Sequence, residues 1–472
     1  MDDQNPNQKT IFATSVKLDD DGVAEMVYDP RGKKTKFALI KKGKVEYQES
    51  LILKDEPVVE PWPSDHQLIK SGFAKLPSEA VETASNLELF EGVREFIKKY
   101  VQVSEEYATV SGVYVLMTWL YDQFDVIPYL RVIGDLGTGK SRFIKSVGEI
   151  CYKPMIIGAS ATLAAIFRTL DIMNGTLVFD EADFRSSESW NEIVKILNSG
   201  HSSGCPVIRM EAKSTGDGFN IKTFNVFGPK ILASRERFRD EALESRCLSY
   251  TLFPQTKLKV PVHLPAEFKT ETLGLRNKLL YFRLKNVNKV NVANIAHDTI
   301  GIPRLKQSFL AELCVAKMIG EEPYKKILSF AKQYETEFIN QLCSSVQADV
   351  LISIVILMND ENFLKRNDRK IRIKEIGDNF ENENYNEYLE KFENHGPYYS
   401  RTVKVSYRQI GEIVRRKLHI TTLRDRGGFF IPPTEHKKIY LLVERYGLQD
   451  YVKDMLAAKK EAEEERNHKV YF

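Results

Sequence analysis

The sequence predicts an α/β protein with a parallel sheet at its centre, and three observations support this fold class. An apolar, β-branched run at residues 130–133 is followed by a glycine-rich loop and an amphipathic run at residues 143–150. A second apolar run, at residues 176–179, ends at paired acidic residues. Strand-like and helix-like segments alternate around these runs, as they do when helices connect parallel strands.

The loop after the first run has the spacing G-x-x-x-x-G-K-[ST], which is typical of a phosphate-binding loop. Its residues are Gly134, Asp135, Leu136, Gly137, Thr138, Gly139, Lys140 and Ser141. Glycines let the backbone N–H groups surround an anion, and the positive end of the following helix adds to the attraction. We expect Lys140 to reach the terminal phosphates and the Ser141 hydroxyl to bind Mg²⁺. An ordinary tight turn is the alternative.

Paired carboxylates at the end of the second apolar run strengthen this interpretation. Asp180 and Glu181 directly follow residues 176–179, and carboxylates at the end of a buried strand need a cationic partner. Asp180 would hold the nucleotide-bound Mg²⁺, usually through water, and Glu181 would polarise the water that attacks the γ-phosphate. The alternative is a strand end that exposes two acids to solvent. Together the two motifs predict hydrolysis of a nucleoside triphosphate.

Composition restricts the class of protein. The chain has 472 residues, of which 43% are apolar and 28% charged, as is ordinary for a soluble globular protein of several domains. It contains no apolar run of membrane-spanning length, and its polar, acidic start does not resemble a signal peptide, so we expect a cytoplasmic protein without membrane contact. Five scattered cysteines predict reduced thiols and no zinc site. A net charge of +3 leaves nucleic-acid binding to local patches.

The period of the apolar residues divides the chain into six segments. These are a small β-rich module (1–60), a helical collar (61–127), an α/β core (128–255), a helical lid with a connecting helix (256–345), a winged-helix domain (346–448) and a charged tail (449–472). Residues 57–63, rich in proline, are expected to form a stiff linker. Lysines of the β-rich module either bind nucleic acid or protect exposed sheet edges from pairing.

Residues 130–250 resemble the AAA+ ATPase core of ring-forming replicative helicases. The likeness is greatest to the MCM-like and superfamily III-like helicases of plasmids, phages and genomic islands. It rests on the two motifs above and on residues 164–168, 207–227, 228–234 and 240–247. The resemblance implies a P-loop NTPase core with ATP and Mg²⁺ as cofactors, a homo-oligomer that is a hexamer, and DNA as partner. It also implies a role in replication of a mobile element, with a primase or polymerase as a further partner.

The resemblance assigns roles to three further residues. Ser234 would be the polar first sensor that orients the attacking water, or would only cap a strand. Arg246 looks like an arginine finger inserted into a neighbouring subunit's site, where a rigid bidentate cation stabilises charge on the γ-phosphoryl oxygens. Arg304 would be the second sensor at the start of a lid helix and would bind nucleotide. The alternatives are that Arg246 is an ordinary surface arginine, or that the finger is Arg235, Arg237 or Arg239.

Two β-like runs within residues 207–227 predict a hairpin with a polar, glycine-bearing tip. In the families resembled, such a pre-sensor hairpin points into the ring's central channel and grips the nucleic-acid backbone. Lys213 at the tip is the first candidate for this contact, followed by Lys222 and Arg209. The alternative is a solvated lysine on an exposed turn.

The segment from residue 346 to 448 has the order helix, helix, basic helix and β wing. Residues 406–417 read as a Ser-capped amphipathic helix, and residues 421–433 as a glycine-turned wing. Between residues 401 and 426 there are eight basic and two acidic residues, a footprint expected for DNA. The DNA-binding candidates are Arg408, Arg415, Arg416, Lys417, Arg424 and Arg426. Contact with another protein is the alternative.

The sequence is compatible with three functions. The first is an ATP-driven, ring-forming DNA helicase or translocase that acts on single- or double-stranded DNA in replication. The second is an ATP-switched DNA-binding regulator or signalling NTPase that does not translocate. A chaperone-type unfoldase is weaker, because the sequence shows no aromatic-glycine pore loop and the hairpin and wing are basic.

Overall fold

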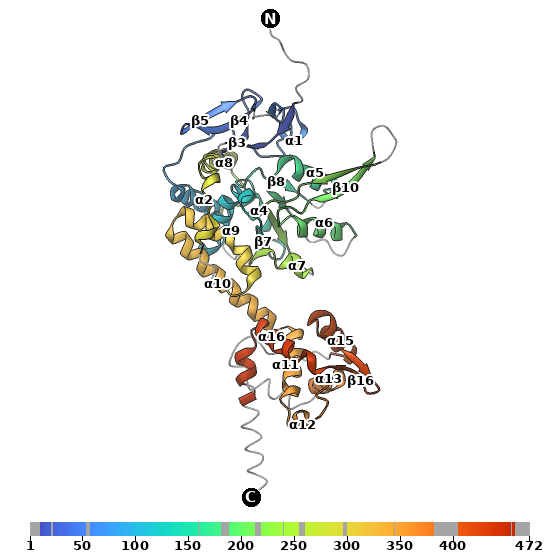
Figure 1. The fold of residues 1–472 in the computed structure, drawn as a ribbon. Helices are drawn as coiled ribbons and strands as arrows, with labels where there is room; N and C mark the ends of the chain where they lie inside the picture. The colour runs from blue at the N-terminus through green and yellow to red at the C-terminus, as the bar shows by residue number, and fades with distance from the viewer. Residues whose placement is uncertain are drawn as a thin grey trace. The chain divides into compact units, whose positions relative to one another are not determined.

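The computed structural model describes residues 10–19, 22–52, 57–158, 160–180, 188–212, 219–238, 240–253, 260–295, 300–343, 345–381, 405–454 and 456–457. These residues belong to two compact units, Met1–Lys332 and Gln333–Phe472 (Figure 1). Among the helices described, none combines the length and the apolar character that crossing a membrane requires.

A parallel sheet of five strands forms the centre of the first unit, in the order β13-β7-β12-β9-β8. Its strands are β7 (Tyr129–Ile133), β8 (Met155–Ile157), β9 (Leu177–Phe179), β12 (Lys230–Ser234) and β13 (Cys247–Thr251). Every residue of β7 and β12 is buried, as expected for central strands of a sheet that is covered on both faces. The predicted α/β class with a parallel sheet is confirmed.

Helices follow the strands of this sheet in the predicted alternation. They are α4 (Lys140–Gly148), α5 (Leu163–Met173), α6 (Glu188–Ser199) and the short α7 (Glu241–Glu244). The side chain of Thr162 caps α5 by accepting the Ala165 N–H. Strand β13 is absent from the sequence-based prediction, because its five residues include polar side chains and show no clear apolar run.

The predicted hairpin is also present. Strands β10 (Val207–Ala212) and β11 (Phe219–Phe224) pair antiparallel in a sheet of their own, inserted between α6 and β12. Figure 1 shows the hairpin extending away from the parallel sheet.

The N-terminal module is built mainly from an antiparallel sheet in the order β2-β3-β4-β5. Its strands are β2 (Ser15–Lys17), β3 (Val23–Asp29), β4 (Lys34–Lys41) and β5 (Lys44–Gln48). The linker expected at residues 57–63 is wrong in part. Within it, β6 (Val59–Pro61) pairs in parallel with β1 (Ile11–Ala13), because Val59 and Pro61 are buried against the module and an edge strand tolerates proline.

Long helices account for most of the remaining part of the first unit. They are α2 (Asn86–Tyr100), α3 (Glu105–Thr118), α8 (Glu267–Asn286), α9 (Pro303–Ile319) and α10 (Glu321–Cys343), of which α10 continues past Lys332. Ser85 and Ser104 cap α2 and α3 through their side-chain oxygens. Every residue of α3 except the first two is buried, and α3 packs against α2 and α9.

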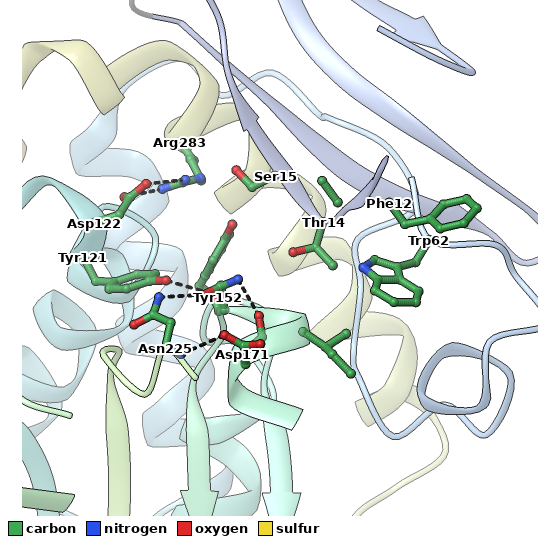
Figure 2. Close-up of a pocket in the computed structure, with 13 residues that line it drawn as sticks. Phe12, Thr14, Ser15, Trp62, Tyr121, Asp122, Tyr152, Asp171, Asn225 and Arg283 are labelled. Carbon is green, nitrogen blue, oxygen red and sulfur yellow. Dashed lines mark hydrogen bonds and ion pairs between the residues drawn. The ribbon is translucent and has the colours of Figure 1, made fainter. Parts of the chain in front are cut away.

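A buried ionic network joins the N-terminal module to the core. Glu25 of β3 accepts hydrogen bonds from Arg283 Nε at 2.7 Å and from the Tyr152 hydroxyl at 2.8 Å, and its Oε2 lies 2.9 Å from Lys153 Nζ. Arg283 also binds both oxygens of Asp122 at 2.8 Å (Figure 2). Burial opposes ionisation of Glu25, but the charges of Arg283 and Lys153 outweigh it and lower the pKa of Glu25. The module is therefore fixed to the core by charge as well as by apolar packing.

The second unit combines helices with the three-stranded antiparallel sheet β14-β16-β15. The predicted Ser-capped helix is confirmed, since Ser406 and Gln409 form a reciprocal capping box at the start of α15. The described elements are α11 (Val346–Met358), α12 (Glu361–Leu364), β14 (Ile371–Arg372), α13 (Ile373–Glu381), α15 (Tyr407–Glu412), a π-helical turn (Ile413–Lys417), β15 (Leu423–Asp425), β16 (Gly428–Ile431) and α16 (His436–Arg445).

Replacement of Glu25 tests the ionic network. We expect Glu25→Gln to lower the free energy of unfolding by about 3–5 kcal/mol, because Arg283 and Lys153 would remain buried with too little negative charge. Urea denaturation measures the loss. Glu46→Gln on β5, where the side chain is exposed, serves as the control and should change stability by less than about 0.5 kcal/mol. Equal stability of the two variants would contradict the proposed role of Glu25.

Glu312 of α9 makes the stability of the fold depend on pH. The residue is fully buried, its two carboxylate oxygens lack hydrogen-bond partners among the described residues, and burial raises its pKa to about 8. Because the folded state favours the neutral carboxyl, stability is highest below the ordinary pKa of 4.5 and falls as the pH rises to about 8, by roughly 5 kcal/mol at most. Glu312→Gln should become increasingly more stable than the wild type across this range in urea denaturation. A difference that does not vary with pH would contradict this assignment.

Candidate nucleotide-binding site

Three neighbouring strands bring the candidate residues to one edge of the sheet. In the register, Ser234 at the end of β12 lies beside Ile133 at the end of β7. Leu232 lies beside Phe179, the last residue of β9, and Asp180 follows directly. Because parallel strands end at the same edge, residues 134–141, Ser234 and Asp180 are close together.

The glycine-rich loop has the backbone that the motif requires. Gly137 and Gly139 have φ values of 82° and 96°, which side chains rarely tolerate, and a Cβ on Gly134 would lie 2.7 Å from the carbonyl oxygen of Leu252. Lys140 Nζ donates to the carbonyls of Gly134 and Asp135 at 2.6 and 2.8 Å, which holds the ammonium within the loop.

The side chains of Thr138 and Leu136 differ in their contribution to the loop. Thr138 Oγ1 donates to the Asp135 carbonyl at 2.9 Å and so closes a local turn. The side chain of Leu136 is 87% exposed, so its part in phosphate binding would come from the backbone.

The residues expected to hold Mg²⁺ lie side by side. Ser141 Oγ donates to Asp180 Oδ1 at 3.3 Å, although 39 positions separate the two residues. A hydroxyl and a carboxylate oxygen at this distance, next to a phosphate loop, fit the oxygen ligands that Mg²⁺ prefers. Glu181, the predicted catalytic base, lies outside the described residues.

Ser234, predicted to be either a polar sensor or a strand cap, is the last residue of β12. Its carbonyl accepts the Gly134 N–H at 3.2 Å, which joins β12 to the start of the loop. The side chain is buried, and its hydroxyl has no hydrogen-bond partner among the described residues. A hydroxyl with unused donor and acceptor capacity beside Asp180 could orient a water molecule or a phosphate oxygen.

Arg246 lies at the opposite edge of the sheet. It directly precedes β13, and its carbonyl accepts the N–H of Tyr129, the first residue of β7, at 2.9 Å. The five residues of β7 therefore separate it from the phosphate loop by about 16 Å along the strand. This separation exceeds the reach of the Arg246 side chain toward the loop of its own chain.

The buried Arg131 of β7 fixes the segment around Arg246. Its Nη2 donates to Glu244 Oε1 at 2.5 Å and to Ser249 Oγ at 2.7 Å, on either side of Arg246 in the sequence. Arg246 is half-buried, and its Nη1 donates to Asn198 Oδ1 at 2.7 Å. The competing Arg237 lies 3.3 Å from Glu244, and Arg235 is exposed. Arg239 lies outside the described residues.

Arg304 gathers with Arg246 at this same edge. Its Nη2 donates to the carbonyl of Ala242, in α7, at 3.4 Å. Burial lowers the pKa of Arg246, and the neighbouring charge of Arg304 lowers it further. Burial and then the charge of Arg246 lower the pKa of His201 to about 4. The structure thus places Arg304 with Arg246, away from the phosphate loop of its own chain.

The described cations of the hairpin are paired with carboxylates. Arg209 and Lys222 lie opposite each other in the hairpin register. Lys222 Nζ lies 2.6 Å from Glu211 Oε2, and Arg209 Nη2 lies 3.6 Å from Glu192 Oε2. Lys213, the first candidate for DNA contact, lies outside the described residues.

The other face of the hairpin is apolar, a feature that the sequence analysis does not predict. Its exposed side chains are Ile208, Met210, Phe219 and Ile221, each at least 59% exposed. The alternation of these residues with polar ones in the sequence indicates one apolar face and one polar face. It does not show which of the two faces packs against the core.

The six basic candidates of the second unit are all exposed. Two of them converge on one aromatic ring, since the guanidinium carbons of Arg415 and Arg424 lie 5.0 and 5.3 Å from the ring centre of Phe429. Arg408 pairs loosely with Glu412 at 3.8 Å. This unit therefore presents cations that are accessible to phosphates.

A cavity of about 270 Å³ adjoins the phosphate loop. Beside loop residues, its walls include Val101, Gln102, Leu252, Val260, Pro261 and Val262. Arg142 donates to the carbonyls of Pro261 and Val262 at 2.9 and 2.5 Å, which fixes that wall to α4. A flat, largely apolar ring would fit here beside bound phosphates. Sequence analysis misses these residues because they come from segments far apart in the chain.

Comparisons with known proteins give no family assignment. No family model matches the sequence, and no curated protein matches it. Among solved structures, the chain is similar to the active Cch helicase of SCCmec type IV, with 14% identity, a TM-score of 0.36 and coverage of 91% of this chain and 99% of that one. A full-length MCM homolog from Methanopyrus kandleri has 10% identity, a TM-score of 0.33 and coverage of 67% and 76%. The apo C-terminal region of NrS-1 has 12% identity, a TM-score of 0.31 and coverage of 86% and 95%.

Proposed function

We propose that this protein is an ATP-dependent, ring-forming DNA helicase or translocase that acts in DNA replication, on a mobile genetic element. The observation that carries the proposal is the meeting of Lys140, Ser141 and Asp180 at one edge of a parallel sheet, with Ser141 Oγ 3.3 Å from Asp180 Oδ1. A phosphate loop and an acidic strand end in this relation suit a magnesium-bound triphosphate.

Each residue has a role in the proposed hydrolysis. The loop N–H groups and Lys140 would bind the phosphates, while Ser141 and Asp180 would hold Mg²⁺, which neutralises developing charge. Glu181 would accept a proton from the attacking water, and the Ser234 hydroxyl would orient that water. The cavity beside Leu252 would hold the base, which favours a nucleotide over an inorganic phosphate.

The position of Arg246 supports assembly of several subunits. Arg246 lies about 16 Å from the loop of its own chain, measured along β7, and Arg304 contacts the nearby Ala242 carbonyl. A neighbouring chain in a ring would bring such a pair to the phosphates of the next subunit, where their charges stabilise the transition state. A hexamer with shared sites agrees with this arrangement.

In this proposal DNA meets two parts of the chain. The hairpin tip with Lys213 would contact the nucleic-acid backbone inside the ring, and the exposed basic residues of the second unit would form a winged-helix contact. A primase or polymerase would act as a separate partner.

An ATP-switched DNA-binding regulator is the second candidate function. The observation that favours it is the pairing of Arg209 and Lys222 with carboxylates, which leaves the described part of the hairpin with few cations for gripping DNA. Such a protein would bind DNA through its second unit and would use ATP only to assemble.

Strand displacement separates these functions. We expect the wild type to hydrolyse ATP and to displace a labelled strand, and we expect Lys140→Ala and Glu181→Gln to lower turnover at least about 100-fold with DNA binding retained. Lys213→Ala should keep basal ATPase activity but lose unwinding. Lys145→Ala, exposed on the same helix as Lys140, is the control and should remain active. ATP hydrolysis and DNA binding without displacement would support the regulator instead.

Mixing two inactive variants tests the shared site. The Lys140→Ala subunit keeps an intact Arg246, and the Arg246→Ala subunit keeps an intact loop. In a mixed ring, a complete site forms where these two parts meet at a subunit interface, which happens at about a quarter of the interfaces when the variants are mixed at equal ratio. ATP turnover of the mixture should rise toward that fraction. A mixture of Lys140→Ala with the Lys140→Ala/Arg246→Ala double variant is the control and should stay inactive. Failure of the first mixture to regain activity would exclude catalysis by Arg246 across subunits.

A further inference from the structure

A second cavity, of about 490 Å³, lies where the N-terminal module meets the core of the first unit. It is distinct from the phosphate loop and belongs to none of the motifs in the sequence. Figure 2 shows Phe12 and Trp62 on one side, Tyr121 and Asp122 on the other, and Asp171 between them. Its volume is within the range of pockets that bind small organic groups.

The walls of this cavity carry a net negative charge. Asp122, Asp171 and Arg283 line it, which gives two carboxylates and one guanidinium and therefore a net charge of −1. Behind the wall, Glu25 and Lys153 pair at 2.9 Å and cancel each other. An anion would be repelled here, and a cation attracted.

On Asp171, the hydrogen-bonding capacity that remains is that of an acceptor. Asp171 Oδ1 accepts the backbone N–H of Asn225 at 2.7 Å, but Oδ2 accepts no hydrogen bond from the residues that the structure describes. The amide of Asn225 is engaged, because its nitrogen donates to Asn174 Oδ1 at 2.9 Å and its oxygen accepts the Phe227 N–H at 3.1 Å. A ligand must therefore bring donors to Asp171.

Aromatic rings supply the facing wall. The ring centres of Phe12 and Trp62 are 5.7 Å apart; Trp62 packs against the buried core, and Phe12 is 43% exposed. A planar guanidinium stacks on such rings and at the same time donates two hydrogen bonds to a carboxylate, which a compact ammonium does not do equally well.

We propose that this cavity binds the guanidinium group of an arginine side chain presented by another polypeptide. The guanidinium would lie against Phe12 and Trp62 and donate to Asp171. A free amino acid fits less well, because its carboxylate needs a cation, and Arg283, the guanidinium on the wall, is already bound to Glu25, Asp122 and the Trp119 carbonyl. Because Asp171 also holds Asn225, directly after β11, the arginine site is joined to the root of the hairpin.

Titration of the full chain with N-acetyl-L-arginine methylamide tests this site, with calorimetry as the readout. We expect saturable binding, with affinity lowered at least about tenfold by Asp171→Asn and about fivefold by Trp62→Leu. Asn at position 171 keeps an oxygen for the Asn225 N–H, so the fold should survive, as a thermal melt would show. Asp65→Asn, which removes an exposed charge near Trp62 but not from the cavity wall, should bind normally.

Two ligands related to N-acetyl-L-arginine methylamide test which chemical group the cavity recognises. The citrulline analogue, neutral and nearly the same shape, should bind at least about tenfold more weakly, and equal binding would overturn the proposal. Free L-arginine should also bind more weakly, and tighter binding would overturn the assignment to a polypeptide. If Asp65→Asn lowered the affinity as much as Asp171→Asn, the effect would come from the overall charge of the protein and not from the cavity, and the proposal would be overturned. None of these outcomes depends on the proposed ATP hydrolysis, which Lys140→Ala tests separately.

Discussion

The parallel register of the central sheet is the constraint on which the candidate site depends. Because all five strands run in one direction, the ends of β7, β12 and β9 share an edge, and the residue before β13 must lie at the other. The first consequence is that Asp180 lies close to Lys140 and Ser141 although about forty positions separate them in the sequence. The second is that Arg246 is separated from them by the length of a strand, whatever rotamer it adopts.

Charge inside the first unit fixes the geometry around this sheet. Glu25, Arg283 and Lys153 are almost fully buried, and apolar side chains in their place would avoid the cost of removing three charges from water. The charges instead require partners from β3, α8 and the segment after α4, so an altered position of the module would leave a buried ion unpaired. Arg283 and Asp122 of the same network line the cavity proposed to bind arginine. The position of Phe12 and Trp62 relative to Asp171 therefore depends on it.

Sequence analysis recovers the features that arise from neighbouring residues. The glycine-rich loop, the apolar strands β7, β9 and β12 and the Ser406 cap each depend on a few consecutive residues. It misses β13 and β6, whose short runs become strands only because a neighbour in space pairs with them. The same reason applies to the cavity walls and to three partners of Glu25 that lie more than a hundred positions away, Tyr152, Lys153 and Arg283. The pattern of neighbouring residues does not predict contacts between segments that are far apart in the sequence.

The distribution of accessible charge limits how the hairpin can contact DNA. The observed register places Arg209 and Lys222 on the same face of the hairpin, near Glu192 and Glu211, and leaves an apolar stripe exposed on the other face. Surface ion pairs are worth at most about 1 kcal/mol, so a phosphate can displace a carboxylate, but it gains little net attraction by doing so. Within the proposed function, phosphate binding therefore depends on Lys213 and on the exposed cations of the second unit. The described strands of the hairpin would offer apolar contact, which suits the faces of bases or another protein surface better than a phosphate backbone.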